Sequence, residues 1–376
     1  MKKIRVGVLF GSRSVEHEVS IVTAMEIFAA LDKEKYEITP IYIGKNGKWF
    51  TGKDLDKLES YFNLELKNNT KLVEYKMPVA MGENKDFDII FTALHGAYGE
   101  DGTVQGVLEM AGIPYIGCGV TASAVGMDKV IQKAVFEREG IPVVKYDWFM
   151  DWEYKSKKEE IIKRLEKKVK YPMCVKPANL GSSIGINFAK NKNELETAVE
   201  IAMEFDRKIL IEEALIGIDE INCAVMGVDI LEASVCEQPI KGDKILSYDE
   251  KYLGGSKSKG MAGMTRLIPA PIKDKMRDQI QDYAKRAFRA IGASGVSRID
   301  FLVNIKKGKV CINEINTMPG GVSFYLWEKS GYNYVQLVDK LIDLGFERFN
   351  KMAKLQRSFE TKLLKTAKGG IKFGNN

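Results

Sequence analysis

The sequence is poor in the residues that build histidine-rich metal centres and disulfide frameworks. Only two of its 376 residues are histidine, which excludes a histidine-rich metal site. Its five cysteines are odd in number and no two are closely spaced, so we expect neither a disulfide framework nor a zinc site. We expect instead reduced cysteines in the core of a cytoplasmic protein.

Long apolar runs and a strong charge of either sign are also missing. Without a stretch of about eighteen apolar residues, no membrane span is expected. The opening MKKIRVGVLFG begins like a signal peptide, but Arg5 interrupts its apolar run and no small-residue cleavage site follows, so we interpret it as a buried strand. The net charge of +6 is mild for this length. The basic tail, residues 351–376, lacks interleaved aromatic residues, so we expect a helix there and no nucleic-acid partner.

Two common nucleotide fingerprints are absent as well. No GxxxxGK[ST] occurs, and Gly7 and Gly11 do not complete GxGxxG. Another phosphate-binding element is possible at Lys176, which ends an expected strand and precedes the loop PANLGSSIG; charge, backbone and hydroxyl donors there suit phosphates, although an ordinary surface hairpin is the alternative. Glu212, at the end of the expected strand 208–213, lies beside a backbone edge that could bind adenine or could simply be solvated.

The order of expected elements indicates several domains. Hydrophobic residues make up 45% of the chain, enough for two or three domains. Alternating strands and helices predict a doubly wound α/β domain over residues 1–121. Residues 122–215 and 216–350 predict two α+β units, the first opening with a helix over 122–139. In the first domain the expected strands cover residues 4–10, 36–43, 88–94 and 114–116, and the expected helices residues 19–31 and 104–110.

The strongest chemical signal is a predicted β-hairpin over residues 297–316. A three-residue turn, 306–308, ends in a glycine suited to a left-handed backbone. This turn length sets Asp300 opposite Glu314 and Arg298 opposite Asn316. Because residues two apart share a face of a strand, all four polar groups point to one side.

Opposed carboxylates repel, so a cation is expected beside Asp300 and Glu314. Such hard oxygen ligands suit Mg²⁺, which takes few protein ligands and completes its shell with phosphates and water. The alternative is a buried network in which Arg298 neutralises both carboxylates. The turn at residues 319–321, Pro-Gly-Gly, favours the metal, because glycines let backbone N–H groups approach an anion.

Two loops of the first domain follow buried strands and are candidate ligand sites. Residues 11–20 join the first strand to the first helix, which is the usual ligand crevice of such folds. Glu16 there could bind an ammonium group or merely complement the helix dipole. His95, in the glycine-rich LHGAYGEDG, would lie at the same sheet edge, although a lone histidine is more often structural.

In chain order, these motifs resemble the D-alanine–D-alanine ligase family of the ATP-grasp group, over about residues 4–345. The resemblance rests on LFGSRSVEHEVS, TALHGAYGEDGTVQGVLEMAGIPYIGCG, MDK, CVKPANLGSSIGI, YDEKYLGG, SRIDF and NEINTMPG. It implies a pre-ATP-grasp domain followed by a two-lobed ATP-grasp fold. It also implies a cytoplasmic homodimer that makes D-alanyl-D-alanine for peptidoglycan precursors of the cell wall.

The resemblance implies roles at matching positions. Catalysis would involve Glu16, Ser182, Tyr252, Arg298 and Gly320. The amino acids would contact His95, Ser323 and Tyr325. ATP would bind at Lys129, Lys176, Ser182, Glu212, Leu215, Glu220 and Lys251. Two Mg²⁺ ions, or Mn²⁺, would bind at Asp300, Glu314 and Asn316, and residues 254–263 would belong to a lid.

The implied reaction has two steps. ATP phosphorylates the carboxylate of the first amino acid, and the amine of the second attacks the acyl phosphate. Cations and lysines would neutralise the transferred phosphate. Arg298 and a backbone N–H at Gly320 would meet the charge that develops in the transition state.

Departures from the family pattern leave alternatives open. Tyr325 stands where the family has a serine that grips the second substrate's carboxylate, and Glu220 lies one residue later than usual. A related ligase with D-serine, D-lactate or another amino acid as second substrate is one alternative, although Tyr252 favours a dipeptide over an ester product. A nucleotide-binding protein without ligase activity is the other, and retention of Arg298 and Asp300 argues against it.

Overall fold

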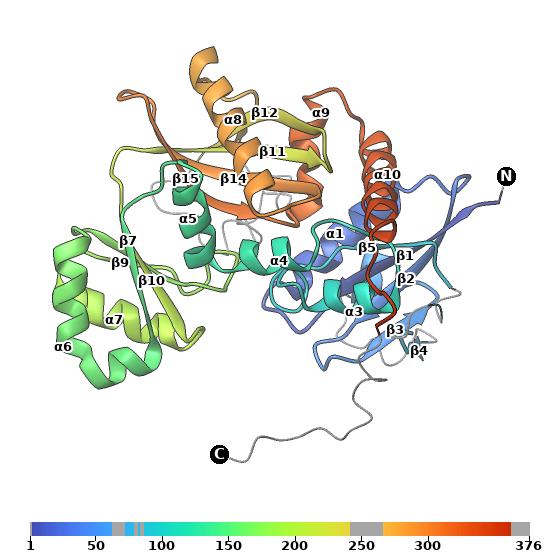
Figure 1. Ribbon diagram of the computed structural model, residues 1–376, viewed down its shortest axis with the longest axis horizontal. Helices are drawn as coiled ribbons and strands as arrows, with labels where there is room; N and C mark the ends of the chain where they lie inside the picture. The colour runs from blue at the N-terminus through green and yellow to red at the C-terminus, as the bar shows by residue number, and fades with distance from the viewer. Residues whose placement is uncertain (1, 62–71, 79–81, 83–85, 241–265, 362–376) are drawn as a thin grey trace.

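The computed structural model describes residues 2–61, 72–78, 82, 86–240 and 266–361. Within these residues the chain forms three parts, each built around one β-sheet (Figure 1). Two of the predicted site residues, Lys251 and Tyr252, and the predicted lid, 254–263, lie outside the described residues.

The first part is the expected doubly wound domain. Its sheet has the strand order β4-β3-β2-β1-β5-β6. The central strand β1 (Ile4–Gly11) runs parallel to both neighbours, β2 (Tyr36–Ile43) and β5 (Ile89–Thr92). After Arg5, β1 is a continuous apolar run over residues 6–10 because both its faces are covered: Val8 packs with helix α1 (His17–Ala30), and Leu9 with helix α3 (Thr103–Ala111). The other elements are β3 (Trp49–Gly52), η1 (Leu58–Tyr61), β4 (Leu72–Glu74) and β6 (Tyr115–Ile116).

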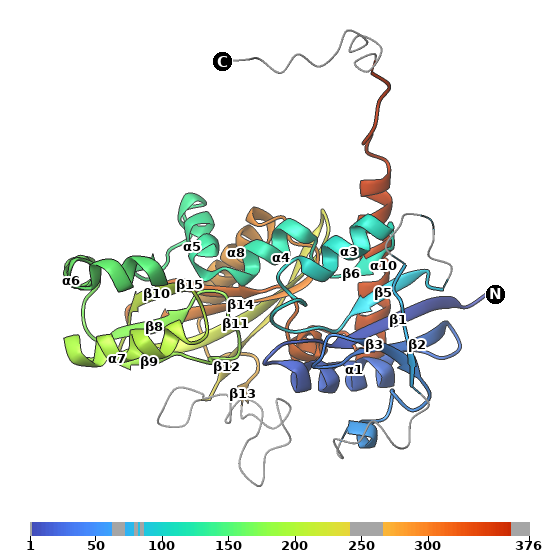
Figure 2. The ribbon, with the colours of Figure 1, turned by 90° about the horizontal axis from the view of Figure 1, so that it is seen from below.

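The last helix among the described residues returns to this first domain (Figure 2). Helix α10 (Tyr334–Ala353) buries Leu337 and Leu341 in the same core as Val8. Gly345 allows a close approach, since a Cβ there would lie 2.8 Å from Ile89. The expected helical tail is wrong for residues 354–361, which contain no helix. All of them are exposed, so no apolar face stabilises a helix there.

The helix expected over residues 122–139 is two helices in the structure. They are α4 (Val120–Met127) and α5 (Lys129–Arg138). Between them the carboxylate of Asp128 accepts hydrogen bonds from the N–H groups of Val130 and Ile131, at 3.0 and 3.1 Å. This N-cap starts a new helix where the apolar spacing alone indicates a continuous one. Lys129 thereby becomes the first residue of α5.

The second part is a small lobe around an antiparallel sheet of order β7-β10-β8-β9. Helices α6 (Asp151–Lys168) and α7 (Lys192–Met203) share one apolar core with the sheet (Figure 1). The strands are β7 (Tyr146–Met150), β8 (Met173–Pro177), β9 (Asn187–Ala189) and β10 (Lys208–Glu213). We call this part the central lobe.

The third part, the C-terminal lobe, has a five-stranded sheet of order β13-β12-β11-β14-β15. Helix α8 (Asp274–Ala290) is amphipathic and buries Ile280 and Phe288 against one face. The strands are β11 (Asp219–Gly227), β12 (Leu231–Pro239), β13 (Arg266–Leu267), β14 (Gly295–Asn304) and β15 (Lys309–Asn316). A 3₁₀ turn η4 (Gly320–Ser323) and a short helix α9 (Phe324–Glu328) follow β15.

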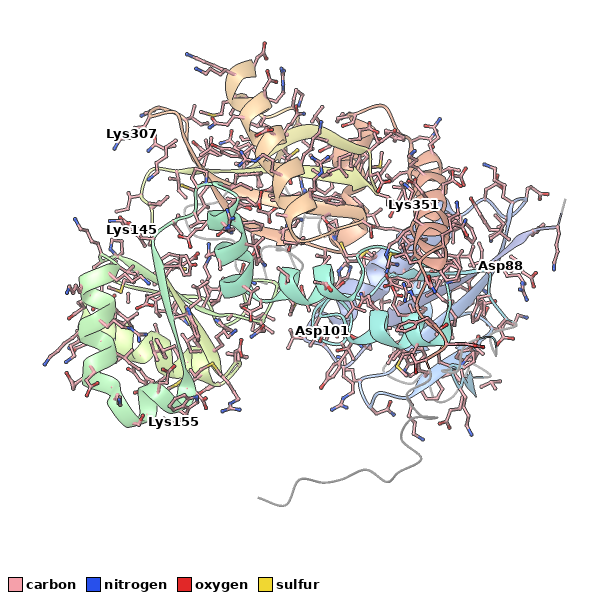
Figure 3. The ribbon with its side chains drawn as sticks, viewed as in Figure 1. Asp88, Asp101, Lys145, Lys155, Lys307 and Lys351 are labelled. Atoms are coloured by element: carbon pink, nitrogen blue, oxygen red, sulfur yellow. The ribbon has the colours of Figure 1, made fainter. Side chains whose placement is uncertain are left out.

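The β14–β15 hairpin has the predicted register at its polar residues. Asp300 pairs with Glu314, and Arg298 pairs with Asn316, so both predicted pairs are confirmed. The predicted turn length is wrong, because the two strands separate a residue earlier and leave a four-residue turn, 305–308. Lys307 lies exposed in this turn (Figure 3).

A β-bulge compensates for the longer turn. Phe301 pairs with Ile312 while Asp300 pairs with Glu314, so Asn313 is an extra residue in β15. A bulge interrupts the alternation of faces. Asn313 and Glu314 therefore line the same pocket although they are adjacent.

Two further observations concern the cysteines and the lengths of the helices. All five cysteines are free and buried, as expected. None of the helices among the described residues combines the length and apolarity needed to cross a membrane.

Candidate active site

Two adjoining pockets open where the three parts meet. The inter-lobe pocket lies between the central and C-terminal lobes, and the central pocket includes residues of all three parts. Five residues line both pockets: Gly181, Ser182, Glu220, Glu314 and Asn316. Most of the other predicted residues line one pocket each. The inter-lobe pocket is lined by Lys129, Lys176, Glu212, Leu215 and Asp300. The central pocket is lined by Glu16, His95, Arg298, Gly320 and Tyr325.

The inter-lobe pocket rests on a buried charge triad. Glu212 is 2% exposed and forms ion pairs with Lys176 and with Lys133, which is 1% exposed. Burial alone would raise the pKa of Glu212, but the two lysines lower it to about 2. Lys133 Nζ also donates to the backbone O of Asn313 at 3.2 Å, so the triad connects α5, the central lobe and the metal-candidate hairpin.

Replacing Lys133 by methionine should destabilise the protein by about 3 kcal/mol, because it removes one partner of a buried ion pair. Thermal or urea unfolding would measure the loss. Lys163→Met is a matched control, since Lys163 is exposed on α6 and should change stability by no more than about 0.5 kcal/mol. Equal stability of the two variants would contradict a structural role for the triad.

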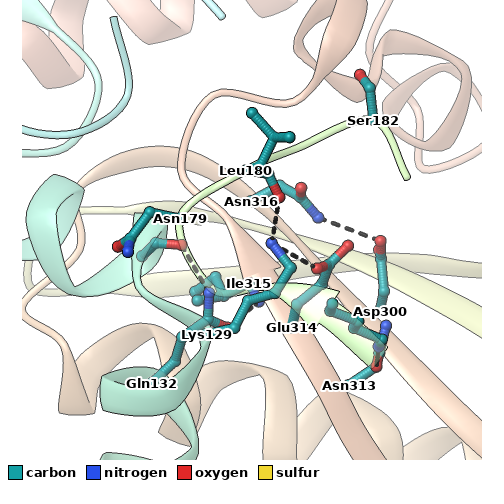
Figure 4. A network of polar contacts seen from close by, with 12 residues as sticks. Lys129, Gln132, Asn179, Leu180, Ser182, Asp300, Asn313, Glu314, Ile315 and Asn316 are labelled. Atoms are coloured by element: carbon teal, nitrogen blue, oxygen red, sulfur yellow. Dashed lines mark hydrogen bonds and ion pairs between the residues drawn. The ribbon is translucent and has the colours of Figure 1, made fainter. Parts of the chain in front are cut away.

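Lys129 and the hairpin meet at the floor of the inter-lobe pocket (Figure 4). Lys129 Nζ donates to the backbone O of Leu180 at 2.8 Å and lies 3.4 Å from Glu314 Oε2. The amide of Asn316 donates to Asp300 Oδ2 at 3.1 Å. Lys129 and Lys176 thus place two ammonium groups beside the carboxylates, where a triphosphate could bind between cations.

The oxygen donors of the hairpin fit a hard divalent cation. Asp300, Glu314 and Asn316 offer two carboxylates and an amide oxygen on one face. Burial, together with nearby Glu220 and Glu314, raises the pKa of Asp300 to about 6 although Arg298 opposes the shift. Three protein ligands leave further positions for phosphate oxygens and water, as Mg²⁺ requires.

Part of the lining of the inter-lobe pocket is apolar. Ile186, Phe188, Leu215 and Ile218 line it beside the end of β10. An apolar slot next to a backbone edge suits a flat heterocycle. Glu220 lies on the pocket face of β11, whereas its neighbour Asp219 accepts a hydrogen bond from Gln238 on another side. The unusual spacing of Glu220 therefore does not remove it from the site.

Arg298 holds Asp300 in a bidentate pair. Its Nε donates to Oδ1 at 2.7 Å and its Nη2 to Oδ2 at 2.8 Å. In the alternative proposed from the sequence, Arg298 neutralises both Asp300 and Glu314 in a buried network. The structure contains the pair with Asp300, but Glu314 pairs with Lys129 instead of Arg298. Arg298 and Gly320 line the central pocket together, so guanidinium and backbone donors face the same space.

Glu16 forms a contact between the first domain and the central lobe. The hydroxyl of Ser182 donates to Glu16 Oε1. The glycine at position 181 allows this close approach, because a Cβ there would lie 2.6 Å from Glu16 Oε2. Glu100 lies close by, and burial together with the charge of Glu16 raises the pKa of Glu100 to about 8. Two neighbouring carboxylates in one pocket favour a cationic ligand such as an ammonium group.

His95 is a neutral imidazole at the base of the central pocket. It is 3% exposed, and its Nε2 lies 2.9 Å from Thr23 Oγ1. Burial lowers the pKa of His95 to about 4. His95 therefore supplies a hydrogen bond at neutral pH and no positive charge.

The imidazole signals of His95 in an NMR titration should stay those of the neutral ring from pH 8 to about 5. The unfolded chain takes up this proton near the ordinary pKa of about 6.5, so the free energy of unfolding should fall as the pH is lowered from there to about 4. With two histidines in the chain, His17→Gln assigns the signals. A midpoint above pH 6 for His95 would contradict the burial argument.

Comparison with known proteins assigns the site to a family. Family models match residues 5–118, as the D-ala D-ala ligase N-terminus, and residues 135–343, as the D-ala D-ala ligase C-terminus. The chain belongs to the D-alanine–D-alanine ligase family. Members are ATP-dependent ligases that generally use Mg²⁺, which agrees with the donor set of the hairpin.

Relatives of this ligase family match nearly the whole chain. The D-alanine–D-alanine ligase of Thermosipho melanesiensis is 40% identical over 380 residues, covering 97% of this chain and 99% of that protein. The one from Acetivibrio thermocellus is 42% identical over 378 residues, covering 94% and 98%.

Solved structures of the family confirm the predicted ATP-grasp fold. The D-alanine–D-alanine ligase from Coxiella burnetii matches with a TM-score of 0.80 at 29% identity, covering 98% of both chains. The VanG D-Ala:D-Ser ligase from Enterococcus faecalis matches with a TM-score of 0.77 at 31% identity, covering 92% of this chain and 100% of that one. The α/β first domain and two following lobes are therefore those of a D-alanine–D-alanine ligase.

Tyr325 and Ser323 correspond to the serine-rich segment of the ligase family, and their side chains occupy different environments. Tyr325 lines the central pocket, as predicted. Ser323 does not, because its side chain is fully buried and lines neither pocket. The backbone of Val322 and Ser323 is left-handed, with φ of 49° and 55°, and this turn buries the Ser323 side chain. Ser323 as a substrate contact therefore stays a prediction that its position in the structure does not support.

Sequence reasoning missed several residues of the ligase site. Glu100 shares a loop with His95, and Asn222 lies two residues beyond Glu220 on the same strand, so both were within reach of pattern arguments. Glu237 and Arg266 also line the central pocket. They are far apart in the sequence and carry no local motif.

Proposed function

We propose that this ligase joins two D-alanine molecules, with ATP in the inter-lobe pocket and the amino acids in the central pocket. The observation that carries the assignment is the shared wall of the two pockets. Glu314 and Asn316 face both, with Lys129 on one side and Arg298 on the other. A transferred phosphate and an amino-acid carboxylate would therefore meet there, and the product D-alanyl-D-alanine serves peptidoglycan synthesis.

Activation of the first D-alanine uses the charge pattern of both pockets. Lys129 and Lys176 bind the phosphates of ATP, while Glu16 and Glu100 hold the ammonium group of the amino acid. His95, as a neutral imidazole, contributes a hydrogen bond near the carboxyl end of this amino acid. The carboxylate oxygen attacks the γ-phosphorus, ADP leaves, and an acyl phosphate forms in a site closed to water.

Attack by the second amine creates a tetrahedral oxyanion. Arg298 and the backbone N–H of Gly320 line the pocket where this charge develops. Donors that are already positioned stabilise the transition state without reorganising. Phosphate then leaves, and the new C–N bond remains. Ser182 keeps Glu16 in place from the central lobe through its hydrogen bond.

The metal and the adenosine are assigned to named groups of the inter-lobe pocket. Asp300, Glu314 and Asn316 would hold two Mg²⁺ ions, for which Mn²⁺ could substitute. Bound divalent ions neutralise the phosphates and polarise the transferred group. Glu212 and Leu215 bind adenine, and Glu220 binds the ribose. Three further roles remain predictions: Lys251 contacts the transferred phosphate, Tyr252 closes over the second amino acid, and residues 254–263 form the lid.

Phosphate release with ATP, Mg²⁺ and D-alanine, followed by mass spectrometry, tests the function. One phosphate per D-alanyl-D-alanine is the expected result. Phosphate without dipeptide would retain activation but reject D-alanine as the second substrate. Absence of phosphate release with any amino acid would favour a binding protein without ligase activity.

D-Serine is the second candidate for the second substrate. Tyr325 replaces the family's serine, and a D-Ala:D-Ser ligase is among the similar solved structures at 31% identity. Equimolar D-alanine and D-serine with ATP would distinguish the products by mass. Assembly as a cytoplasmic homodimer is also proposed, on the family resemblance alone, and sedimentation analysis tests the dimer.

A further inference from the structure

Three side chains form a compact cluster at one wall of the central pocket. Arg266 Nη1 donates to Glu237 Oε2 at 3.0 Å. The guanidinium of Arg266 also lies over the Tyr325 ring, with its Cζ 3.9 Å from the ring centroid. All three residues line the pocket, although they come from β13, β12 and α9.

Glu237 engages the hydroxyl that replaces the family's serine. Tyr325 Oη donates to Glu237 Oε1 at 2.9 Å, and Asn222 Nδ2 donates to the same oxygen at 3.0 Å. A phenol has a single O–H donor. Since this donor points at Glu237, the Tyr325 hydroxyl is not aimed at a substrate carboxylate. Its ring instead supports the guanidinium.

The charge of the pocket makes a cation necessary for any carboxylate that enters. The carboxylates of Glu16, Glu237 and Glu314 all line it. Among the described lining residues the permanent cations are Arg266 and Arg298, and Arg298 is held by Asp300 in a bidentate pair. A guanidinium has five N–H donors, so Arg266 can serve Glu237 and a second carboxylate together.

We propose that Arg266 is the receptor for the carboxylate of the second amino acid, and that Glu237 and Tyr325 are positioning residues for it. The proposal rests on the assignment of the central pocket to the amino acids. In it, an arginine stacked on a tyrosine does what a serine hydroxyl does elsewhere in the family. The buried Glu237, 1% exposed, fixes the guanidinium plane through one edge, and the ring fixes it through one face.

Competition between D-alanine and D-alaninamide tests the proposal directly. The amide lacks a carboxylate, so it can react only as the second substrate and cannot contact Arg266 as an anion does. With equal concentrations of both, mass spectrometry gives the ratio of dipeptide to dipeptide amide. Arg266→Gln should shift this ratio about 100-fold towards the amide relative to the wild type, whereas Arg266→Lys should shift it less.

Two matched variants separate this role from others. Tyr325→Phe removes the hydroxyl but keeps the ring, so it should change the ratio by no more than about threefold. Arg277→Gln, on the surface of α8, should leave both rate and ratio unchanged. A large shift in Tyr325→Phe with none in Arg266→Gln would assign the carboxylate to the hydroxyl and overturn the proposal.

Trapping the acyl phosphate with hydroxylamine distinguishes failure of this inference from failure of the proposed function. Wild type and Arg266→Gln should both form D-alanine hydroxamate, because Arg266 acts after activation. Absence of hydroxamate in the wild type would reject the proposed function. Normal hydroxamate with an unchanged product ratio in Arg266→Gln would reject the receptor role. Loss of hydroxamate in Arg266→Gln, with an unshifted ratio in Arg266→Lys, would assign Arg266 a structural role instead.

Discussion

Replacing Glu314 by glutamine is expected to lower ATP-dependent phosphate release by about 1000-fold, the upper end of the loss that follows removal of one preorganised group that stabilises the transition state. Glutamine keeps the shape but removes the charge that faces Lys129 at 3.4 Å and pairs with Asp300 across the hairpin. With one carboxylate left, the hairpin holds a divalent cation poorly. Phosphate release with ATP, Mg²⁺ and D-alanine is the measurement.

The fold of the Glu314→Gln variant should be intact, because the side chain is partly exposed in the pocket and glutamine has the same size. Circular dichroism and thermal unfolding would verify this. Glu328→Gln is the control, as Glu328 is half exposed on α9 in the same lobe. Wild-type phosphate release in Glu314→Gln would reject the metal assignment of the hairpin.

Replacing Arg298 by lysine is expected to lower kcat for dipeptide formation by about 100-fold with little change in KM. Lysine keeps the charge but cannot form the two parallel hydrogen bonds that orient Arg298 on Asp300. The ammonium group would therefore lie off the position where the oxyanion develops. Steady-state kinetics with D-alanine separates the two parameters.

The matched control is Arg277→Lys, a surface arginine of α8 that pairs with Asp274 and Asp278. It should retain wild-type kcat. If Arg298→Lys raised KM and left kcat unaltered, Arg298 would be a ground-state binding group, and the oxyanion role would have to pass to other donors.

Much of the fold is visible in the sequence where burial imposes a simple pattern. β1 was predicted because a strand covered on both faces is a run of apolar residues, here residues 6–10, and β2 was predicted with its observed bounds. The break between α4 and α5 at Asp128 was not predicted. The apolar spacing continues through this position, and only the side-chain cap of Asp128 separates the two helices. The helical tail was predicted from composition, but residues 354–361 have no surface to pack against.

In the site, too, contacts between residues close in the sequence were predicted, whereas contacts between residues far apart in the sequence were not. Asp300 and Glu314 belong to one hairpin, so their pairing followed from local pattern, although the turn and the bulge were both missed and their effects cancelled. Arg266 and Tyr325 meet only through the packing of β13 beside β12 and of α9 against the sheet. No spacing rule in the sequence joins such residues.

The bulge at Asn313 also has a consequence for how the hairpin tolerates insertions. It lies between the exposed turn, 305–308, and the paired carboxylates, so a change of register at the tip can be taken up before it reaches Asp300. The lysine-rich turn is therefore a place where the gene could gain or lose a codon, or accept a peptide tag, while the two carboxylates stay opposite each other. The pairing of Asp300 with Glu314 therefore does not depend on the length of the turn.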